Sequence, residues 1–478
     1  MTDNKIMKIH SILQSLPDKK LEGLKQLFWE ELNYDQARQP IQTSDWDDEL
    51  REQFAEPPTL FATAANEDAF HIIHGHLKIE KMSAGIERTI ITKLIKQHPH
   101  SLFIFSNHSQ THWHFVNAVY EKDEKAQRRR ILRRISVSKE DRLRTASERI
   151  ARLDTTLVQR ELFGVDVFVL QKQHEEAFDV EAVTQEFFND YKNIFNQLVD
   201  ELNRQTNDRL WAHDFALQFL NRLMFLYYIE RKRWLGNDPD FLHNYWRAYQ
   251  NTSRETDSFV SKWLEILFFE AFNKRFSAGR SDVAFIPEHF RQALQLAPWL
   301  NGGLFTKNSL DTQHAYRIHD KRIDQILNFL DRYNFTISED TPLDQEVAVD
   351  PEMIGKVYES LVNVSAETDE QGDAGIFYTP RIEIDLMCRL SLVDWLANHL
   401  PDINKSVLYE FVFAFDHEDK LAADQELTRL NLWTEIDPLL NEVTILDPAC
   451  GSGSFLVGML LILDDLLARC ANALGRAE

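Results

Sequence analysis

The chain has 478 residues, of which 44% are hydrophobic and 27% are charged, and these proportions indicate a folded globular protein and exclude a disordered one. A formal net charge of −23 argues against a protein that coats nucleic acid non-specifically, although a local basic face for DNA is compatible with it. The N-terminus is polar, no apolar run reaches the length of a membrane span, and the three cysteines lack C-x-x-C spacing, so we expect a cytoplasmic protein without structural zinc.

The first 55 residues are predicted to be helical apart from a polar connector over Gln39–Trp46, because leucines recur mostly at three- and four-residue steps from Leu13 to Leu32. Residues 56–178 have a different pattern, in which short apolar or alternating runs predict an α/β domain. The predicted strands are, in order, Ala69–Ile79, Ser101–Ser106, Thr111–Tyr120, Arg130–Val137 and Val165–Leu170. We expect the third and fourth of them to form a hairpin and the fifth to close the sheet.

Five histidines in this domain suggest a metal site, but no acidic ligands stand at a matching spacing, so we interpret them as structural. They are His71, His74, His76, His112 and His114. A metal-dependent nuclease is a second hypothesis, and a degenerate nuclease-like domain is its weaker form, because no Pro-Asp…Glu-x-Lys pattern is present. The residues available to such a nuclease are Asp68, Glu80, Lys81, Asp123 and Lys125.

A dense basic cluster begins at Arg128-Arg-Arg-Ile-Leu-Arg-Arg-Ile135 and continues through Lys139, Arg142, Arg144, Arg149 and Arg152. We favour a solvated surface of a helix or hairpin, because charge runs usually lie on the surface. The alternative is a restricted face for binding DNA phosphates.

Residues 179–365 are predicted to form a helical domain. The expected helices are Ala182–Leu202, Trp211–Lys232, Asp257–Phe276 and Asp350–Leu361. The second is apolar almost all round, which indicates a core helix. Between the third and the fourth, Pro298–Phe305 contains a Gly-Gly turn.

The last part, residues 366–478, contains the stretch with the clearest chemistry. A helix is predicted over Arg381–Leu396, and Val443–Leu446 reads as a strand that is buried on both faces. Asp447 follows that strand, a glycine-rich turn comes next, and a helix over Ser454–Cys470 is expected to have Ser452 or Ser454 as its N-cap. Strand, glycine turn and helix are typical of a nucleotide-type site in a doubly wound sheet, but neither G-x-G-x-x-G nor G-K-[ST] is present.

The stretch Asp447-Pro-Ala-Cys-Gly-Ser-Gly-Ser-Phe455 resembles the first motif of S-adenosylmethionine-dependent methyltransferases, and in particular of N6-adenine-specific DNA methyltransferases. Phe377-Tyr-Thr-Pro380 resembles the element that precedes this motif in the same enzymes. Two further segments, Ile229–Leu235 and Trp299–Phe305, look like parts of type IIG restriction–modification and phage-defence enzymes, so the resemblance spans roughly residues 210–478.

This resemblance implies a site-specific DNA methyltransferase that transfers a methyl group from S-adenosyl-L-methionine to adenine N6 in double-stranded DNA. It also implies a cofactor site, and its residues here are Phe377, Tyr378, Thr379, Pro380, Asp447, Pro448, Ala449, Cys450, Gly451, Gly453 and Phe455. Restriction–modification or phage defence is the implied role.

The chain departs from the family because no Asn/Asp-Pro-Pro-Tyr/Phe motif follows Phe455, so we assign no catalytic residue. Asp464 and Asp465 fall in the predicted helix, and the acid that binds the cofactor ribose is therefore missing too. We expect α/β and helical domains followed by the start of an incomplete Rossmann-like methyltransferase domain. A missing C-terminal segment or a partner subunit would complete its sheet, and this chain alone would be inactive.

Three alternatives stay open at this point. The chain could be a non-catalytic DNA-binding or scaffold subunit, a truncated inactive fragment, or part of a combined restriction endonuclease and methyltransferase.

Overall fold

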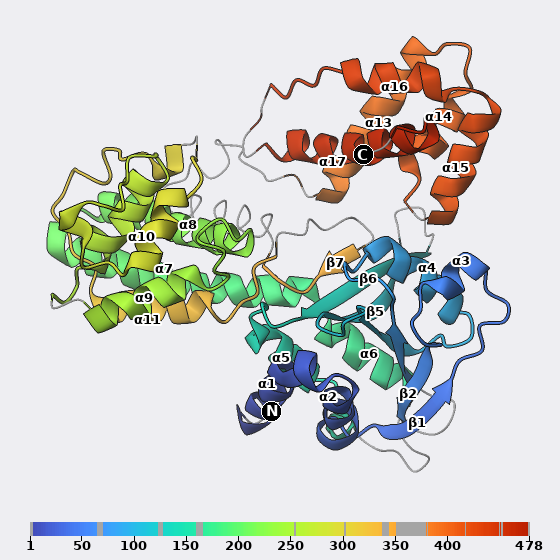
Figure 1. The fold of residues 1–478 in the computed structure, drawn as a ribbon, viewed down its shortest axis with the longest axis horizontal. Coiled ribbons are helices and arrows are strands. Elements are labelled where there is room, and N and C mark those ends of the chain that lie inside the picture. Colours follow the sequence, from blue (N-terminus) through green and yellow to red (C-terminus); the bar gives the residue numbers. More distant parts are fainter. Residues whose placement is uncertain are drawn as a thin grey trace, which may run out of the picture.

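The computed structural model describes residues 3–64, 70–122, 128–158, 166–252, 255–300, 303–336, 344–349, 379, 381–415, 417–448, 450 and 453–476. They form a mixed seven-stranded sheet and many helices, so the predicted α/β-plus-helical class is confirmed (Figure 1). Within these residues, no helix has the length and apolar character that crossing a membrane requires.

The sheet has its strands in the order β1-β2-β3-β4-β5-β6-β7. Strands β3 and β4 run parallel and are connected through helix α4 (Ala84–Leu94), and β6 and β7 are also parallel, whereas the other neighbouring pairs are antiparallel. The strands are β1 (Asp35–Pro40), β2 (Thr59–Ala64), β3 (Phe70–His76), β4 (Ser101–Ser106), β5 (Trp113–Lys122), β6 (Arg128–Val137) and β7 (Asp344–Glu346).

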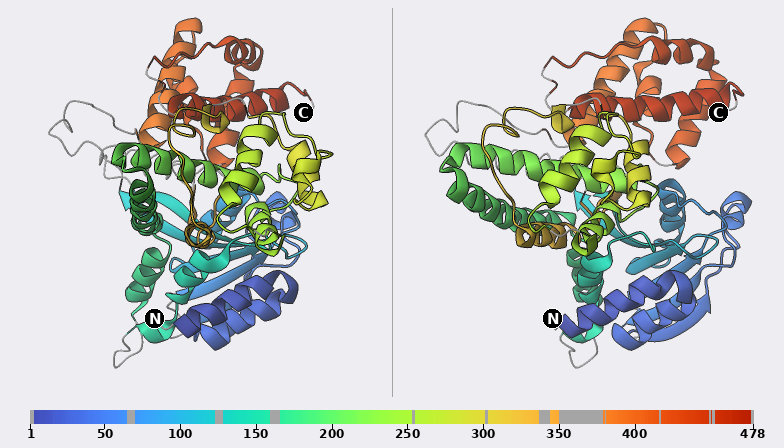
Figure 2. Two further views of the ribbon diagram at one scale, coloured as in Figure 1. Left: turned by 90° about the vertical axis from the view of Figure 1, so that its left-hand side faces the viewer. Right: turned by 60° about the vertical axis from the view of Figure 1, so that its left-hand side comes forward.

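Both faces of the sheet are buried, and the alternation of side chains along β4 shows how. Leu102 and Ile104 belong to a core that includes helices α1 (Asp3–Lys19), α5 (Leu143–Ala151) and α6 (Val167–Ala177). Phe103 and Phe105 belong to a second core beneath α4 and the short helix α3 (Asp48–Glu52). Figure 2 shows the N-terminal helices lying along one face of the sheet.

Most of the predicted strands are confirmed, and β4 has the predicted bounds. The β5–β6 hairpin is also confirmed, with Phe115 paired to Ile135. The predicted strand Val165–Leu170 is wrong, because Val167–Ala177 is helix α6. The Asp166 carboxylate caps this helix by accepting a hydrogen bond of 2.8 Å from the backbone N–H of Phe168.

The N-terminal segment is only partly helical. After α1, α2 (Leu21–Lys25) and a π-helical turn over Gln26–Glu31, the chain forms the exposed edge strand β1, where helix had been expected. An edge strand needs no apolar face of its own, so its polar sequence did not reveal it.

The helical region follows the sheet. It contains α7 (Val180–Thr206), α8 (Arg209–Arg231), α9 (Phe241–Thr252), α10 (Glu288–Leu296) and α11 (Asp320–Leu330). The first two confirm the predictions made for them. Between them, the Asp208 carboxylate caps α8 by accepting a 3.0 Å hydrogen bond from the N–H of Trp211. The predicted third helix is largely π-helical, over Val260–Leu264 and Ile266–Ala271, and the predicted helix Asp350–Leu361 lies outside the described residues.

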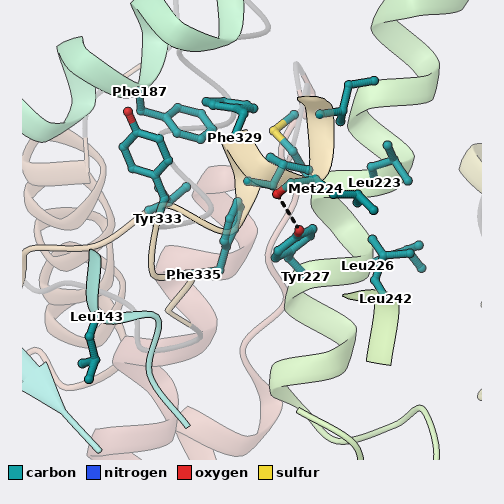
Figure 3. Close-up of a cluster of buried hydrophobic side chains, with 14 of the residues drawn as sticks. Leu143, Phe187, Leu223, Met224, Leu226, Tyr227, Leu242, Phe329, Tyr333 and Phe335 are labelled. Atoms are coloured by element: carbon teal, nitrogen blue, oxygen red, sulfur yellow. Dashed lines mark hydrogen bonds between the residues drawn. The ribbon is translucent and has the colours of Figure 1, made fainter. Parts of the chain in front are cut away.

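Aromatic side chains join these helices to one another (Figure 3). Phe187 on α7 lies 5.3 Å from Phe329 on α11 and 4.9 Å from Tyr333, measured between ring centroids. Tyr227 on α8 lies 4.9 Å from Phe335. The core that contains these rings also includes α1 and one face of the sheet, so the sheet and the helical region share one hydrophobic core.

The C-terminal helices form a group of their own (Figure 1), and their buried side chains make up a separate hydrophobic core. They are α13 (Arg381–His399), α14 (Lys405–Phe413), α15 (His417–Arg429), α16 (Trp433–Glu442) and α17 (Ser454–Ala473). The predicted strand Val443–Leu446 is wrong in this structure: these residues have no ladder partner among the described ones, and Leu446 is 86% exposed. A strand is stabilised by its neighbours, and the described part of this region supplies none.

Candidate cofactor site at the start of α17

The predicted motif lies where α16 ends and α17 begins. Residues 443–447 have no regular structure, and the backbone N–H of Gly453 donates a 2.7 Å hydrogen bond to the carbonyl of Cys450. Gly453 has φ +84° and occupies the N-cap position of α17. The expectation that Ser454 caps the helix is therefore wrong, because Ser454 is already helical, and Ser452 lies outside the described residues.

The N-cap residue of α17, Gly453, has no side chain with which to accept a hydrogen bond from the first N–H groups of the helix. The first N–H groups of a helix have no partner within it, and the helix dipole places positive potential at this end. A 20-residue helix that begins with a glycine in the left-handed region can therefore accept an anionic group from a ligand.

A pocket of about 430 Å³ adjoins the motif. Three of the predicted cofactor residues, Asp447, Pro448 and Phe455, line it together. Its other walls are mostly apolar and come from α13, the segment before Asp447 and the first turns of α17: Met387, Cys388, Ser391, Leu392, Trp395, Val443, Thr444, Ile445, Leu446 and Met459.

Cys388 is not a nucleophile in this pocket. Burial, together with the nearby carboxylates of Asp385 and Asp447, raises the pKa of its thiol to about 11. The thiol stays protonated at neutral pH, and its sulfur lies 3.6 Å from the backbone carbonyl of Phe455. Cys388 thus helps to join α13 to α17.

The remaining predicted site residues are only partly visible. Gly453 is described as above, Cys450 is exposed, and Thr379 is half-buried. Phe377, Tyr378, Pro380, Ala449 and Gly451 lie outside the described residues, so closure of the Phe-Tyr-Thr-Pro segment over the pocket stays a prediction.

These residues fit half of S-adenosylmethionine. The N-terminus of α17 suits the methionine carboxylate, the Asp447 carboxylate suits the ammonium, and the apolar walls suit the methylene groups. Asp447 is the one acidic residue that lines the pocket within the described part of the chain. Asp464 and Asp465 lie in α17 as expected, Asp465 pairs with Lys420 at 2.5 Å, and neither lines the pocket.

The five histidines of the sheet domain have structural partners. His74 is buried, its Nε2 lies 3.1 Å from the Ser106 hydroxyl, and burial lowers its pKa to about 3. The Nδ1 of His114 lies 2.5 Å from a carboxylate oxygen of Glu87. His71, His76 and His112 contact His98, the His108 carbonyl and Thr111, respectively. Over the described ranges, no group of three His, Cys, Asp or Glu side chains is close enough to hold a metal ion.

The nuclease hypothesis is tested only in part. The Glu80 carboxylate accepts hydrogen bonds of 2.9 Å from Asn107 and 2.8 Å from Ser109, so it connects two loops at the ends of β3 and β4. Lys81 is exposed. The other residues that this hypothesis names, Asp68, Asp123 and Lys125, lie outside the described residues.

Several arginines of the basic cluster are buried in ion pairs, so the solvated-surface interpretation is wrong for these residues. Arg134 is buried and donates hydrogen bonds of 2.7 and 3.0 Å to Glu87. Arg142 donates a 2.9 Å hydrogen bond to Glu230, and Arg149 is buried as well. Glu87 and Glu230 stand 47 and 88 residues away in sequence from their arginines, a separation at which sequence patterns give no signal.

The structure also packs α8, the helix that ends in the segment Ile229–Leu235, against the Gly-Gly turn. Arg222 on α8 donates a 2.7 Å hydrogen bond from Nε to the carbonyl of Leu304 in the Gly-Gly turn, and two more, of 2.6 and 3.0 Å, to Asp311. The side chains of Arg222 and Asp311 are each 2% exposed. The rings of Phe225 and Phe305 lie 5.7 Å apart. The sequence indicated both segments but not this buried pair of Arg222 and Asp311, which we call the Arg222–Asp311 clamp.

Comparison with known proteins gives a partial likeness. No model of a known family and no solved structure matches the chain. Over 260 residues, or 52% of the chain, the sequence is 32% identical to a protein of Methanocaldococcus jannaschii whose name describes it as a candidate type II restriction enzyme and methyltransferase. The chain spans about a fifth of that relative, because the match covers 20% of it. This likeness supports a relationship to restriction–modification methyltransferases.

Proposed function

We propose that this chain provides the methionine half of the S-adenosylmethionine site of an adenine-specific DNA methyltransferase in a restriction–modification or phage-defence system. One observation carries the proposal: Asp447, Pro448 and Phe455 line a single pocket beside the N-terminus of α17, which begins at a glycine. The motif that contains them requires this arrangement of a carboxylate, a glycine turn and a helix N-terminus.

The roles of the chain's own residues follow from their chemistry. The Asp447 carboxylate holds an ammonium group, the N–H groups of α17 hold a carboxylate, and Phe455 with the α13 side chains excludes water from the apolar part of the ligand. When bound, S-adenosylmethionine supplies the methyl group. Double-stranded DNA is the proposed substrate, with adenine flipped out of the helix before it reacts at N6.

Catalysis requires residues that this chain lacks. The aromatic and amide groups that hold a flipped adenine come from an Asn/Asp-Pro-Pro-Tyr/Phe motif, which is absent after Phe455. We therefore place the catalytic half on another polypeptide segment and expect no methyl transfer by these 478 residues alone.

A methylation assay tests this proposal. The chain is co-expressed with the polypeptide encoded immediately downstream, and N6-methyladenine in the recovered plasmid DNA is measured by mass spectrometry. We expect N6-methyladenine only when both parts are present, and at least a tenfold loss with Asp447→Asn, since a hydrogen bond to a charged group contributes about 1.5–3 kcal/mol. Asp402→Asn, at an exposed aspartate outside the pocket, is the control. Undiminished methylation in Asp447→Asn, or none with both parts present, would contradict the proposal.

A combined endonuclease and methyltransferase is the second candidate, favoured by the relative's name, which includes a restriction enzyme. The test is magnesium-dependent cleavage of unmethylated DNA by the same assembly. Cleavage that Glu80→Ala abolishes would support a nuclease in the sheet domain, and absence of cleavage would leave the methyltransferase alone.

A further inference from the structure

Two histidine side chains meet at the edge of the sheet where β3 begins, far in sequence from the candidate cofactor site. His71 is the second residue of β3, and His98 lies in the loop between α4 and β4. Their Nδ1 atoms are 3.0 Å apart, and their ring planes stand at 76° to each other. The sequence pattern did not indicate His98, because 27 residues separate it from His71. We call these two residues the histidine pair.

Backbone and side-chain hydrogen bonds hold both members of the pair in place. In β3, His71 is paired with Thr63 of β2 on one side and with Ser101 of β4 on the other. The N–H of His98 donates a 2.9 Å hydrogen bond to the Leu94 carbonyl at the end of α4. The carbonyl of His98 accepts a 3.0 Å hydrogen bond from the Ser101 hydroxyl. Because both imidazoles are held by ordered segments, binding a third group between them costs little conformational entropy.

The separation of the two nitrogens matches what two ligands of one transition-metal ion require. Imidazole nitrogens bind such ions at about 2.0–2.1 Å. At that length, the separation of 3.0 Å corresponds to an angle of about 94° at the ion, whereas a tetrahedral angle needs a separation of about 3.3 Å. An angle near 90° is typical of the square-planar or tetragonal ions Cu²⁺ and Ni²⁺, and imidazole suits both of them.

The position of the pair leaves the rest of a coordination shell to water. His71 and His98 are both half-buried, so solvent reaches them. Within the part of the chain that the structure describes, no third His, Cys, Asp or Glu side chain completes a protein shell. The hydrogen bond between the two Nδ1 atoms requires a proton on one of them. On metal binding this proton would move to the Nε2 of the same ring, so no proton is lost overall.

We propose that the histidine pair binds one divalent transition-metal ion of square-planar or tetragonal preference, Cu²⁺ or Ni²⁺, through its two Nδ1 atoms and water. The bound ion would join the start of β3 to the loop between α4 and β4. This site shares no residue with the pocket beside α17, so the inference does not depend on the proposed function.

Titration with Cu²⁺ tests this proposal. The full chain, without an affinity tag and after treatment with a chelator, is titrated at pH 7.5, where an imidazole with an ordinary pKa of about 6.5 is mostly neutral. Calorimetry measures the affinity, and electron paramagnetic resonance of the bound Cu²⁺ counts its nitrogen ligands. We expect one tightest site with two nitrogen ligands. Saturating Ni²⁺ should raise the melting temperature by at least about 2 °C, because the ion binds the folded state.

Three variants separate a metal site from a plain hydrogen bond and from general binding by histidines. His98→Gln keeps a group that can hydrogen-bond to His71 but removes one nitrogen ligand, so it should weaken binding at the tightest site at least about tenfold. His71→Gln should have the same effect. His108→Gln is the control, because the exposed His108 ring stacks 6.1 Å from His76, whose Nε2 faces the His108 backbone carbonyl. This variant should bind Cu²⁺ as the wild type does.

Two results would overturn the inference. Equal Cu²⁺ affinity for the wild type and His98→Gln would mean that the ion binds elsewhere on the chain and that the pair is a hydrogen bond alone. Fewer than two nitrogen ligands in the resonance spectrum of the tightest site would exclude the pair as well. The nitrogen count is measured on the wild type, so it decides the question even if a variant fails to fold.

Discussion

The Arg222–Asp311 clamp gives a quantitative prediction for the helical region. Replacing Arg222 with leucine leaves the Asp311 carboxylate buried without its cation and also removes the hydrogen bond to the Leu304 carbonyl. Removing one partner of a buried ion pair typically costs about 3–5 kcal/mol, and a lost neutral hydrogen bond about 1 kcal/mol. Asp311 keeps hydrogen bonds from the Asn308 N–H at 3.0 Å and from Gln218 at 3.2 Å, which moderates the loss. We therefore expect Arg222→Leu to lower the free energy of unfolding by about 3–5 kcal/mol.

A double-mutant cycle measured by urea unfolding checks this value. Arg222→Leu, Asp311→Leu and the double variant are compared with the wild type. The double variant should lose less stability than the sum of the single variants, with a coupling of more than about 2 kcal/mol, because it leaves no unpaired buried charge. The exposed pair of Arg280 and Asp282 is the control, and Asp282→Ala should leave stability unchanged within error. Additive effects, or a loss below about 1 kcal/mol for Arg222→Leu, would refute the reasoning.

Three further predictions concern other parts of the chain. Burial lowers the pKa of His174 to about 3, so the fold holds its neutral form and loses stability as pH falls below the unfolded value of about 6.5. Between pH 7 and pH 5 the free energy of unfolding should fall by about 2 kcal/mol because of this histidine. In His174→Leu, the fall measured by urea unfolding should be smaller by that amount. An unchanged fall would contradict the prediction. In Gly453→Ala the added Cβ meets no atom within 4 Å, so the variant should lose only about 1–2 kcal/mol of stability, from backbone strain at φ +84°. The strain should appear as faster amide exchange at the start of α17. Unchanged exchange would argue against a strained N-cap. Gly75→Ala places a Cβ 3.0 Å from the rings of Phe54 and Phe105. This crowding should lower the free energy of unfolding by about 1–3 kcal/mol, measured by thermal unfolding. An unaltered melting temperature would show that the rings move freely.

The spacing of apolar residues correctly predicted the helices and strands that bury one regular apolar face. Strand β4, the β5–β6 hairpin and helices α7 and α8 formed where the apolar spacing placed them, because each buries the face that the spacing marks. The same logic failed at Val165–Leu170, where a β-branched run was read as a strand although the Asp166 carboxylate caps a helix. It failed at β1 too, because this edge strand has no apolar face.

The candidate site was predictable as a motif but not as a packed structure. The resemblance to a methyltransferase motif identified Asp447 and Phe455 as site residues, and the structure shows that they line one pocket. The strand expected before them is not formed, because pairing depends on neighbours that local sequence does not encode. The surface location predicted for the arginine cluster was wrong for a related reason. The carboxylates that pair with Arg134 and Arg142 come from distant parts of the chain.

Calorimetry with S-adenosylmethionine tests the central claim most directly. The ligand is titrated into the wild-type chain, Asp447→Ala and Asp402→Ala, each alone and in complex with the polypeptide encoded downstream. We predict saturable binding to the wild-type complex, at least tenfold weaker binding to Asp447→Ala, and unaltered binding to Asp402→Ala. Equal binding heats for the wild type and Asp447→Ala would remove Asp447 from the site and contradict a cofactor role for the start of α17.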